Sequence, residues 1–247
     1  VAAGVVALAI IAALVATSFG LVRARHERAE AIDARNATRD VLVFYEELLE
    51  SANAFRSGRS TTLEELLAEA EMRFGAMETL RDDATSAAIR MAIARSYVSL
   101  MRWERAEPHL RAALAYYDGA GRSEETTLLR AECLVMLGRA LTHLRRPEAV
   151  AMQREAVSVR TAKLGRVDVR TAEAIGCLGF ATWASGGPAD YDLAERHYRE
   201  AIAIFENLDQ RATPDAARIT MSLGYMLAHL ERDDEAETLY RDCLLYT

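Results

Sequence analysis

The chain has 247 residues, of which 51% are hydrophobic and 27% are charged, and it contains only four prolines. Such a composition is typical of a helical globular protein, because Ala, Leu, Arg and Glu dominate and helix breakers are few. A net charge of -7 excludes nucleic acid as the main partner, since phosphate binding needs a concentrated excess of Lys and Arg.

Residues 1–22 contain no charged side chain. A helix of this length spans roughly 33 Å, enough to cross a hydrocarbon core of about 30 Å, so the segment is predicted to be a transmembrane helix. A signal peptide is the alternative, but its apolar core is usually only about 7–15 residues long. The run begins at Val1 without an initiator methionine, and we expect the protein to extend further at its N-terminal side.

Residues 23–83 are predicted to form a juxtamembrane helical region. Arg23, Arg25 and Arg28 follow the span and by themselves would place this side in the cytoplasm. The opposite flank is missing, so the orientation stays open at this point. An apolar stripe over 41–49 indicates one helix, and a second is expected to run from an N-cap at Ser60 or Thr61 to about Leu80.

The C-terminal part, 84–247, repeats one phrase four times, as "ERAEPHLRAAL", "PEAVAMQREAV", "LAERHYREAI" and "ERDDEAETLYRDCL". The alanines that open the phrases are 43, 45 and 42 residues apart, and another small residue follows each of them after seven positions. Seven residues is nearly two helical turns, so both small residues share one helix face and let a neighbouring helix approach closely. These pairs are Ala106 and Ala113, Ala149 and Ala156, Ala194 and Ala201, and Ala236 and Cys243.

Upstream of each phrase lies another helical stretch with its own small residue after an aliphatic one. The repeating unit is therefore a helix–turn–helix, and four units are expected around 86–117, 124–163, 168–207 and 214–247. One helix pair cannot bury both of its faces, whereas stacked pairs share a continuous core. The aliphatic and small residues are Ile93 and Ala94, Leu137 and Gly138, Leu178 and Gly179, and Leu223 and Gly224.

The repeated pattern resembles the tetratricopeptide repeat, and its long period is similar to that of the repeats of kinesin light chains. The resemblance implies an all-α fold in which antiparallel helix pairs stack as a right-handed α-solenoid. Ala94 replaces the usual glycine, and Gln153 stands where the other units have Leu110, Tyr198 and Tyr240, so unit two is expected to pack less well. The resemblance rests on Ala94, Tyr97, Trp103, Ala106, Leu110, Ala113, Leu137, Gly138, Ala149, Ala156, Leu178, Gly179, Ala194, Tyr198, Ala201, Leu223, Gly224, Ala236, Tyr240 and Cys243.

The last residues, Leu244, Leu245 and Tyr246, are apolar, although terminal repeats normally carry a polar outer face. We therefore expect further repeats to follow, so that this sequence is truncated at both ends.

The order of segments resembles the C-terminal half of bacterial membrane-anchored serine/threonine protein kinases. The order is a span, an Arg/Glu/Ala-rich helix, "VLVFYEELLESAN", "GRSTTLEELLAEAEMRF" and then the repeats. The resemblance implies a signalling role as a sensor or scaffold region that acts through partner binding or dimerisation. It also implies a kinase domain before Val1, the bacterial inner membrane as location, and repeats outside the cytoplasm. The alternative is a free-standing membrane-anchored scaffold or assembly factor without a kinase.

No catalytic, cofactor or metal site is predicted in this segment. It contains no glycine-rich kinase loop with HRD and DFG, and no HExxH, GxSxG or GxxxxGK[ST], so any enzyme activity depends on the parent chain. His109 and His197 occupy equivalent places two units apart, as do His143 and His229, and neither pair is expected to hold a metal. The three cysteines lie outside any CxxC motif and are interpreted as small buried helix residues.

What remains is a surface for protein or peptide partners. The first helices of stacked repeats line a concave face, and side chains one and four or five positions after each small residue point towards it. We expect this face to change from basic in units one and two to aromatic in units three and four, while Tyr97 and Trp103 belong to the core. The alternative is that its aromatic residues pack against the next unit. The candidate groove residues are Arg95, Ser99, Arg139, His143, Phe180, Trp183, Tyr225 and His229.

Overall fold

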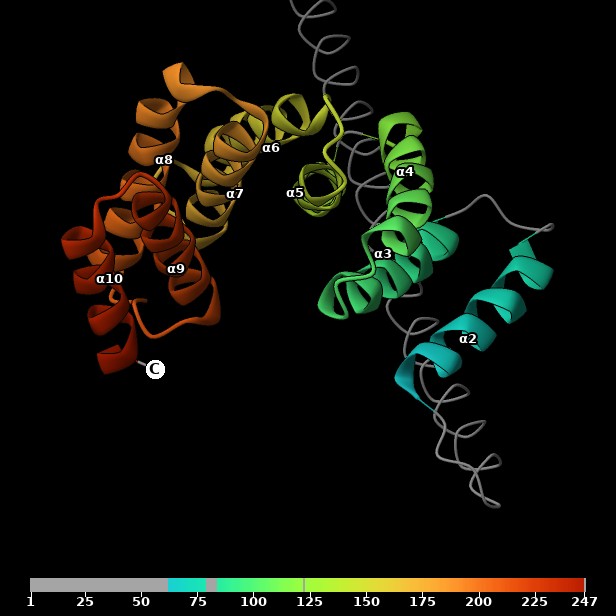
Figure 1. Cartoon of the computed structure of the whole chain (residues 1–247). Helices are drawn as coiled ribbons and strands as arrows, with labels where there is room; N and C mark the ends of the chain where they lie inside the picture. The colour runs from blue at the N-terminus through green and yellow to red at the C-terminus, as the bar shows by residue number, and fades with distance from the viewer. Residues whose placement is uncertain (1–61, 79–83, 122, 247) are drawn as a thin grey trace, which may run out of the picture. The chain divides into compact units, whose positions relative to one another are not determined.

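The computed structural model describes residues 62–78, 84–121 and 123–246, and these residues form nine helices and no strand (Figure 1). None of the helices within these ranges combines the length and the apolar character needed to cross a bilayer. The predicted span 1–22 and the predicted helix over 41–49 lie outside the described residues. The helices are α2 Leu63–Glu78, α3 Ala84–Ser99, α4 Trp103–Gly119, α5 Glu124–His143, α6 Ala149–Leu164, α7 Val169–Ser185, α8 Pro188–Asn207, α9 Pro214–His229 and α10 Asp233–Tyr246.

The chain divides into two compact units, Val1–Ile89 and Arg90–Thr247. In the first, α2 begins with a reciprocal pair of hydrogen bonds: the Thr62 backbone N–H donates to Glu65 Oε2 (2.9 Å), and the Glu65 N–H donates to Thr62 Oγ1 (3.2 Å). The N-cap is therefore Thr62, and the prediction of Ser60 or Thr61 was wrong, because Glu65 is three residues after Thr62 as a capping box requires.

The second unit is a stack of helix pairs. Each helix from α4 to α10 packs against the next one in the sequence, and the first helices also contact one another, α5 with α7 and α7 with α9. Contacts limited to neighbouring elements are the mark of a repeat protein. The prediction of an all-α helical-repeat fold is confirmed for this part of the chain.

The small residues that define the repeat lie where the helices approach most closely. A methyl group added at Gly179 would stand 3.2 Å from the carbonyl oxygen of Ala194 and from the ring of Tyr198. The equivalent addition at Gly224 would stand 2.7 Å from the ring of Tyr240. The alanines of the second helices are likewise covered, with at most 2% of their surface exposed: Ala106, Ala113, Ala149, Ala156, Ala194, Ala201 and Ala236.

Three of the four turns inside the helix pairs share one backbone geometry. Met101, Arg145 and Glu231 have φ of 55°, 53° and 60°, in the left-handed region that ends many helices. In each case the next residue donates its N–H to a carbonyl five positions earlier: Arg102 to Tyr97 (2.8 Å), Arg146 to Leu141 (2.8 Å) and Arg232 to Leu227 (3.0 Å).

Side-chain caps define where the first helices α5, α7 and α9 begin. Ser123, Asp168 and Thr213 accept hydrogen bonds from backbone N–H groups of the first helical turn, at 3.1, 2.9 and 3.4 Å respectively. Each cap satisfies donors that the helix itself cannot satisfy. The caps thereby fix the first residue of each of these helices.

Candidate functional site

A groove of about 820 Å³ runs along the first helices of the second unit. It is lined by residues of α3, α5, α7 and α9, with contributions from the turn before α4, from the first residue of α4 and from Arg160 of α6. Its size matches that of pockets that hold peptides or small molecules. Two sets of side chains, one aromatic and one charged, give it its chemical character.

The aromatic set links four helices. The ring of Trp103 on α4 stacks on His143 of α5, with 4.0 Å between the ring centres and 5° between the planes. His143 contacts Phe180 of α7 at 5.1 Å, and Phe180 contacts Trp183 at 6.2 Å. Trp183 then reaches two rings of α9, Tyr225 at 5.5 Å and His229 at 6.1 Å. We call these six residues the aromatic ladder: Trp103, His143, Phe180, Trp183, Tyr225 and His229.

His143 keeps part of its surface exposed, but its ring is partly desolvated between Trp103 and Phe180. This burial, followed by the positive charge of Arg139, lowers the pKa of His143 below its usual value. Both causes disfavour the imidazolium form. The neutral imidazole of His143 is therefore favoured between its two aromatic neighbours.

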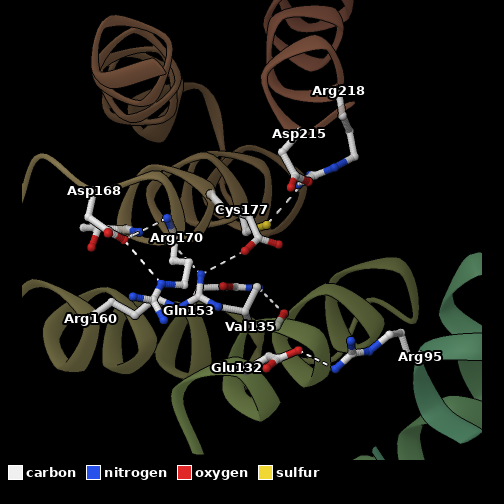
Figure 2. Close-up of polar contacts among 12 residues, drawn as sticks. Arg95, Glu132, Val135, Gln153, Arg160, Asp168, Arg170, Cys177, Asp215 and Arg218 are labelled. Atoms are coloured by element: carbon white, nitrogen blue, oxygen red, sulfur yellow. Dashed lines mark hydrogen bonds and ion pairs between the residues drawn. The ribbon is translucent and has the colours of Figure 1, made fainter. Parts of the chain in front are cut away.

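The charged set consists of five groove arginines and three carboxylates. Three of the five are already paired with a carboxylate, Arg95 and Arg160 with one on another helix and Arg218 with one on its own helix. Arg95 donates to Glu132 at 2.6 Å and Arg218 to Asp215 at 3.0 Å (Figure 2). Arg160 donates to Glu173 at 2.9 Å. The groove arginines are Arg95, Arg139, Arg160, Arg170 and Arg218, and the carboxylates are Glu132, Glu173 and Asp215.

Arg160 is the most deeply buried of the five, with 5% of its side chain exposed. It extends from α6 towards the start of α7 (Figure 2). There its guanidinium donates to the carbonyl oxygen of Arg170 and to Glu173. Asp168 caps the same helix start and lies 3.7 Å from the guanidinium of Arg170. This cluster joins α6 to α7 and shapes the middle of the groove, because a buried charge needs such partners.

Arg139 differs from the other groove arginines. It is partly buried on α5, and its side chain forms no hydrogen bond or ion pair with any residue in the described part of the chain. Its charge contributes to the lowered pKa of His143, which lies one helical turn further along α5. Arg139 therefore presents an uncompensated positive charge beside the aromatic ladder.

The thiols near the groove are not suited to covalent chemistry. Burial raises the pKa of Cys133 to about 12 and also raises the pKa of Cys177, so both stay protonated at neutral pH. Cys177 lies on the groove lining, with its sulfur 3.8 Å from Arg218 Nη1. Among residues 62–78, 84–121 and 123–246, no three His, Cys, Asp or Glu side chains are grouped closely enough to hold a metal ion.

The structure brings five of the eight candidate residues together on the groove lining, and the other three extend the ladder beyond it. Phe180 and Trp183 also pack partly against the core, as the alternative interpretation suggested, whereas Tyr225 is exposed. Peptide binding by these residues stays a prediction. The lining residues are Arg95, Ser99, Arg139, His143 and Phe180, and the ladder residues beyond them are Trp183, Tyr225 and His229.

The expected change from a basic to an aromatic end is not seen. Arginines and rings both run through all units, because Arg170 and Arg218 lie earlier on their helices than the positions considered from the sequence. Trp103, interpreted as core, lines the groove instead, since it is the first residue of α4 and stacks on His143. The sequence signal for this position was that Trp103 stands at a helix start, where a side chain lies at the edge of a helix stack and not in its core.

Comparisons with known proteins support the fold. Models of the tetratricopeptide repeat family match residues 130–168 and 189–244. No curated protein sequence matches the chain. Because tetratricopeptide repeats bind other proteins, the chain contains a protein–protein interaction module.

The solved structures that are similar to this chain include the following three. BtubC (BKLC) from P. vanneervenii is 17% identical with a TM-score of 0.56, over 76% of this chain and 74% of that one. A kinesin light chain protein with nearly identical repeats from Podosopora anserina is 16% identical with a TM-score of 0.57, over 85% and 93%. The apo form of RapI is 15% identical with a TM-score of 0.58, over 82% and 69%. Identity this low shows the fold alone.

Proposed function

We propose that this tetratricopeptide-repeat chain binds an extended or helical peptide segment of a partner protein in the groove between its first helices. The observation that carries this proposal is a groove of about 820 Å³ that combines aromatic rings of the ladder with an arginine that has no ion-pair partner among the described residues. Apolar side chains of a partner would pack on the rings, and a polar group would fix their register.

The proposal is tested by blocking the groove. A library of random twelve-residue peptides is selected on the full chain in detergent, and the affinities of selected peptides are measured by calorimetry. Ser99 is exposed on the groove lining, so Ser99→Tyr fills space without removing a buried side chain. Ser158 is exposed on α6 away from the groove, and Ser158→Tyr is the matched control.

The proposal requires Ser99→Tyr to weaken binding at least about tenfold, which corresponds to about 1.4 kcal/mol, while Ser158→Tyr leaves it unchanged. Equal affinities for Ser99→Tyr and the unaltered chain would show that the peptides bind elsewhere. If no peptide is enriched over a surface without protein, the groove is not a peptide site.

We further propose that the module is anchored in the bacterial inner membrane by residues 1–22, with the repeats outside the cytoplasm. The support is the uncharged stretch of 22 residues, long enough to cross a bilayer. Protease added to intact spheroplasts should then cleave the repeats and spare a cytoplasmic marker. If the repeats are protected until the membrane is permeabilised, they lie in the cytoplasm and the proposed orientation is wrong. If the chain is recovered in the soluble fraction, residues 1–22 do not anchor it.

The parent protein is proposed to be a serine/threonine kinase whose output responds to partner binding or to dimerisation of this module. The support is the order of a span, a helical region and tetratricopeptide repeats. The sequence encoded upstream of Val1 tests this directly. A glycine-rich loop with HRD and DFG motifs would support the kinase, and a start codon a few residues upstream would favour the free-standing scaffold instead.

A further inference from the structure

We propose that the groove selects a peptide with a single acidic side chain, bound by Arg139 and flanked by apolar side chains on the aromatic ladder, and that it rejects runs of acidic residues. This inference rests on the proposed peptide-binding function and adds the chemistry of the ligand. It follows from the way in which charge is distributed and compensated along the groove.

Arg139 is the natural contact for an anion. Its guanidinium is partly buried on the groove lining and has no hydrogen-bond or ion-pair partner among the described residues. A partly desolvated arginine without a counter-ion gains more from a carboxylate than one that is fully solvated. A carboxylate bound here would also complete the hydrogen bonding of a fork of donors that is now unused.

The other groove arginines offer much less to a ligand. Arg95, Arg160 and Arg218 are each paired with a carboxylate at 2.6 to 3.0 Å, and Arg170 lies 3.7 Å from Asp168. A ligand carboxylate would have to displace those partners rather than fill a vacancy. Arg139 is therefore the one groove arginine, among the described residues, that a ligand can neutralise without breaking an existing pair.

Additional acidic residues on the ligand would meet negative charge. Glu132, Glu173 and Asp215 also line the groove. A second cavity of about 470 Å³ shares Glu132, Arg160 and Arg170 with the groove and adds the exposed carboxylates of Glu124 and Glu125. Like charges at close range repel each other. The repulsion between a run of acidic residues and these carboxylates would therefore offset the attraction of the ligand to Arg139.

The neighbouring residues of the ligand are specified by the ladder. Arg139 and His143 lie four residues apart on α5, so they occupy the same helix face. His143 continues directly into Trp103 on one side and Phe180 on the other. A peptide with its carboxylate on Arg139 therefore places the adjacent side chains over these rings, where apolar or aromatic groups pack best.

The test compares selected peptides on Arg139 variants of the full chain. Each peptide that binds is synthesised with its acidic residue intact, changed to the corresponding amide, and extended by three further glutamates. Affinities are measured for the unaltered chain, for Arg139→Gln and for Arg139→Lys. Arg154 is an exposed arginine of α6 outside the groove, and Arg154→Gln is the control with the same charge change.

On the unaltered chain, the amide peptide should bind about tenfold more weakly than the acid, a difference of about 1.4 kcal/mol. On Arg139→Gln the acid and amide peptides should bind with equal affinity. The difference in affinity between them should be partly retained on Arg139→Lys and fully retained on Arg154→Gln. The peptide with added glutamates should bind more weakly than its parent.

An undiminished preference for the acid on Arg139→Gln would overturn the inference while leaving the peptide-binding function intact. Tighter binding of the glutamate-extended peptide would overturn the single-charge rule in the same way. Failure of the proposed function gives a different result, namely unchanged peptide affinity on Ser99→Tyr. Such peptides bind outside the groove, whatever their charge preference.

Discussion

The amide of Gln153 on α6 lies directly against Gly138 on α5: a Cβ atom added at Gly138 would stand 2.5 Å from Gln153 Nε2. That nitrogen donates to the carbonyl oxygen of Val135 at 2.9 Å, and Gln153 has none of its surface exposed. The same relationship recurs with rings in the pairs Gly179 and Tyr198, and Gly224 and Tyr240. The glycine of the first helix thus makes room for the large residue of the second.

Gly138→Ala should therefore destabilise the fold. The added methyl group would overlap the side chain of Gln153, which is fully buried and cannot move aside, so we expect a loss of about 1–3 kcal/mol in the free energy of unfolding. Gly119→Ala is the control, because its added methyl has nothing within 4 Å, and it should be neutral or slightly stabilising. Urea unfolding followed by circular dichroism measures both, and equal effects at the two sites would contradict the close approach.

Gln153→Met should leave the stability unchanged or raise it by up to about 1 kcal/mol. The Oε1 atom of Gln153 is buried without a hydrogen-bond partner in the described part of the chain, and a thioether of similar shape removes this cost. The carbonyl oxygen of Val135 lies inside α5 and keeps its helical partner. A loss of more than about 1 kcal/mol in the same unfolding assay would mean that the hydrogen bond to Val135 outweighs the unpaired oxygen. The expectation that unit two packs less well stays a prediction until then.

Arg160→Met should cost about 3–5 kcal/mol, because it leaves Glu173 without its partner next to the carbonyl oxygen of Arg170. The double variant Arg160→Met with Glu173→Leu should recover a large part of this loss, since no uncompensated charge then remains. Arg154→Met, on the exposed face of the same helix, should change the stability by less than about 0.5 kcal/mol. A double variant no better than the single one would contradict the explanation by charge.

The stability should fall on acidification below about pH 6.5, the usual pKa of histidine. The pKa of His143 and of His197 is lowered in the folded chain, first by burial in both cases, so the unfolded chain binds more protons between the folded pKa and the unfolded one. Stability therefore rises with pH across that window. His143→Gln should reduce the slope measured by denaturation at several pH values, and an unchanged slope would assign the effect to other groups.

Glu195→Gln should weaken the contact between α8 and α10 by up to about 1 kcal/mol. Glu195 accepts hydrogen bonds from Arg232 at 2.7 Å and from Arg199 at 2.7 Å, and the first of these contributes most to lowering its pKa. A lowered carboxyl pKa means that this stability is present above the unfolded value and is lost as the pH falls through the folded value. Glu237→Gln, in a pair with both side chains more than half exposed, should have no measurable effect. Equal losses in 1 M salt and in dilute buffer would argue against an electrostatic origin.

The repeat itself could be predicted because its signal is local. Ala106 and Ala113 share a helix face at any position of the chain, so the spacing alone predicted their burial, and the structure confirms it. The N-cap of α2 was placed one or two residues too early because Ser60, Thr61 and Thr62 are chemically alike, and only the reach of Glu65 selects among them.

The candidate site was harder to predict, because its character depends on which charges meet. Arg95 and Glu132 are 37 residues apart in sequence, and their pairing depends on how α3 and α5 are stacked. Arg160 reaches α7 only because the segment between α6 and α7 turns at Gly165, whose φ is 86°. No spacing rule shows that Arg139 is the groove arginine without an ion-pair partner among the described residues. That property emerges only when every neighbouring pair has been placed.

The aromatic ladder also gives the protein an optical property. The sequence contains two tryptophans, and both of them, Trp103 and Trp183, belong to the ladder. The intrinsic tryptophan fluorescence of the whole chain therefore originates at the aromatic ladder, with one ring stacked on His143 and the other set edge-on to Tyr225. A ligand that moves or desolvates these rings would change the tryptophan emission, so no attached dye is needed. The binding of a ligand that contains no tryptophan could therefore be measured from this change in emission alone.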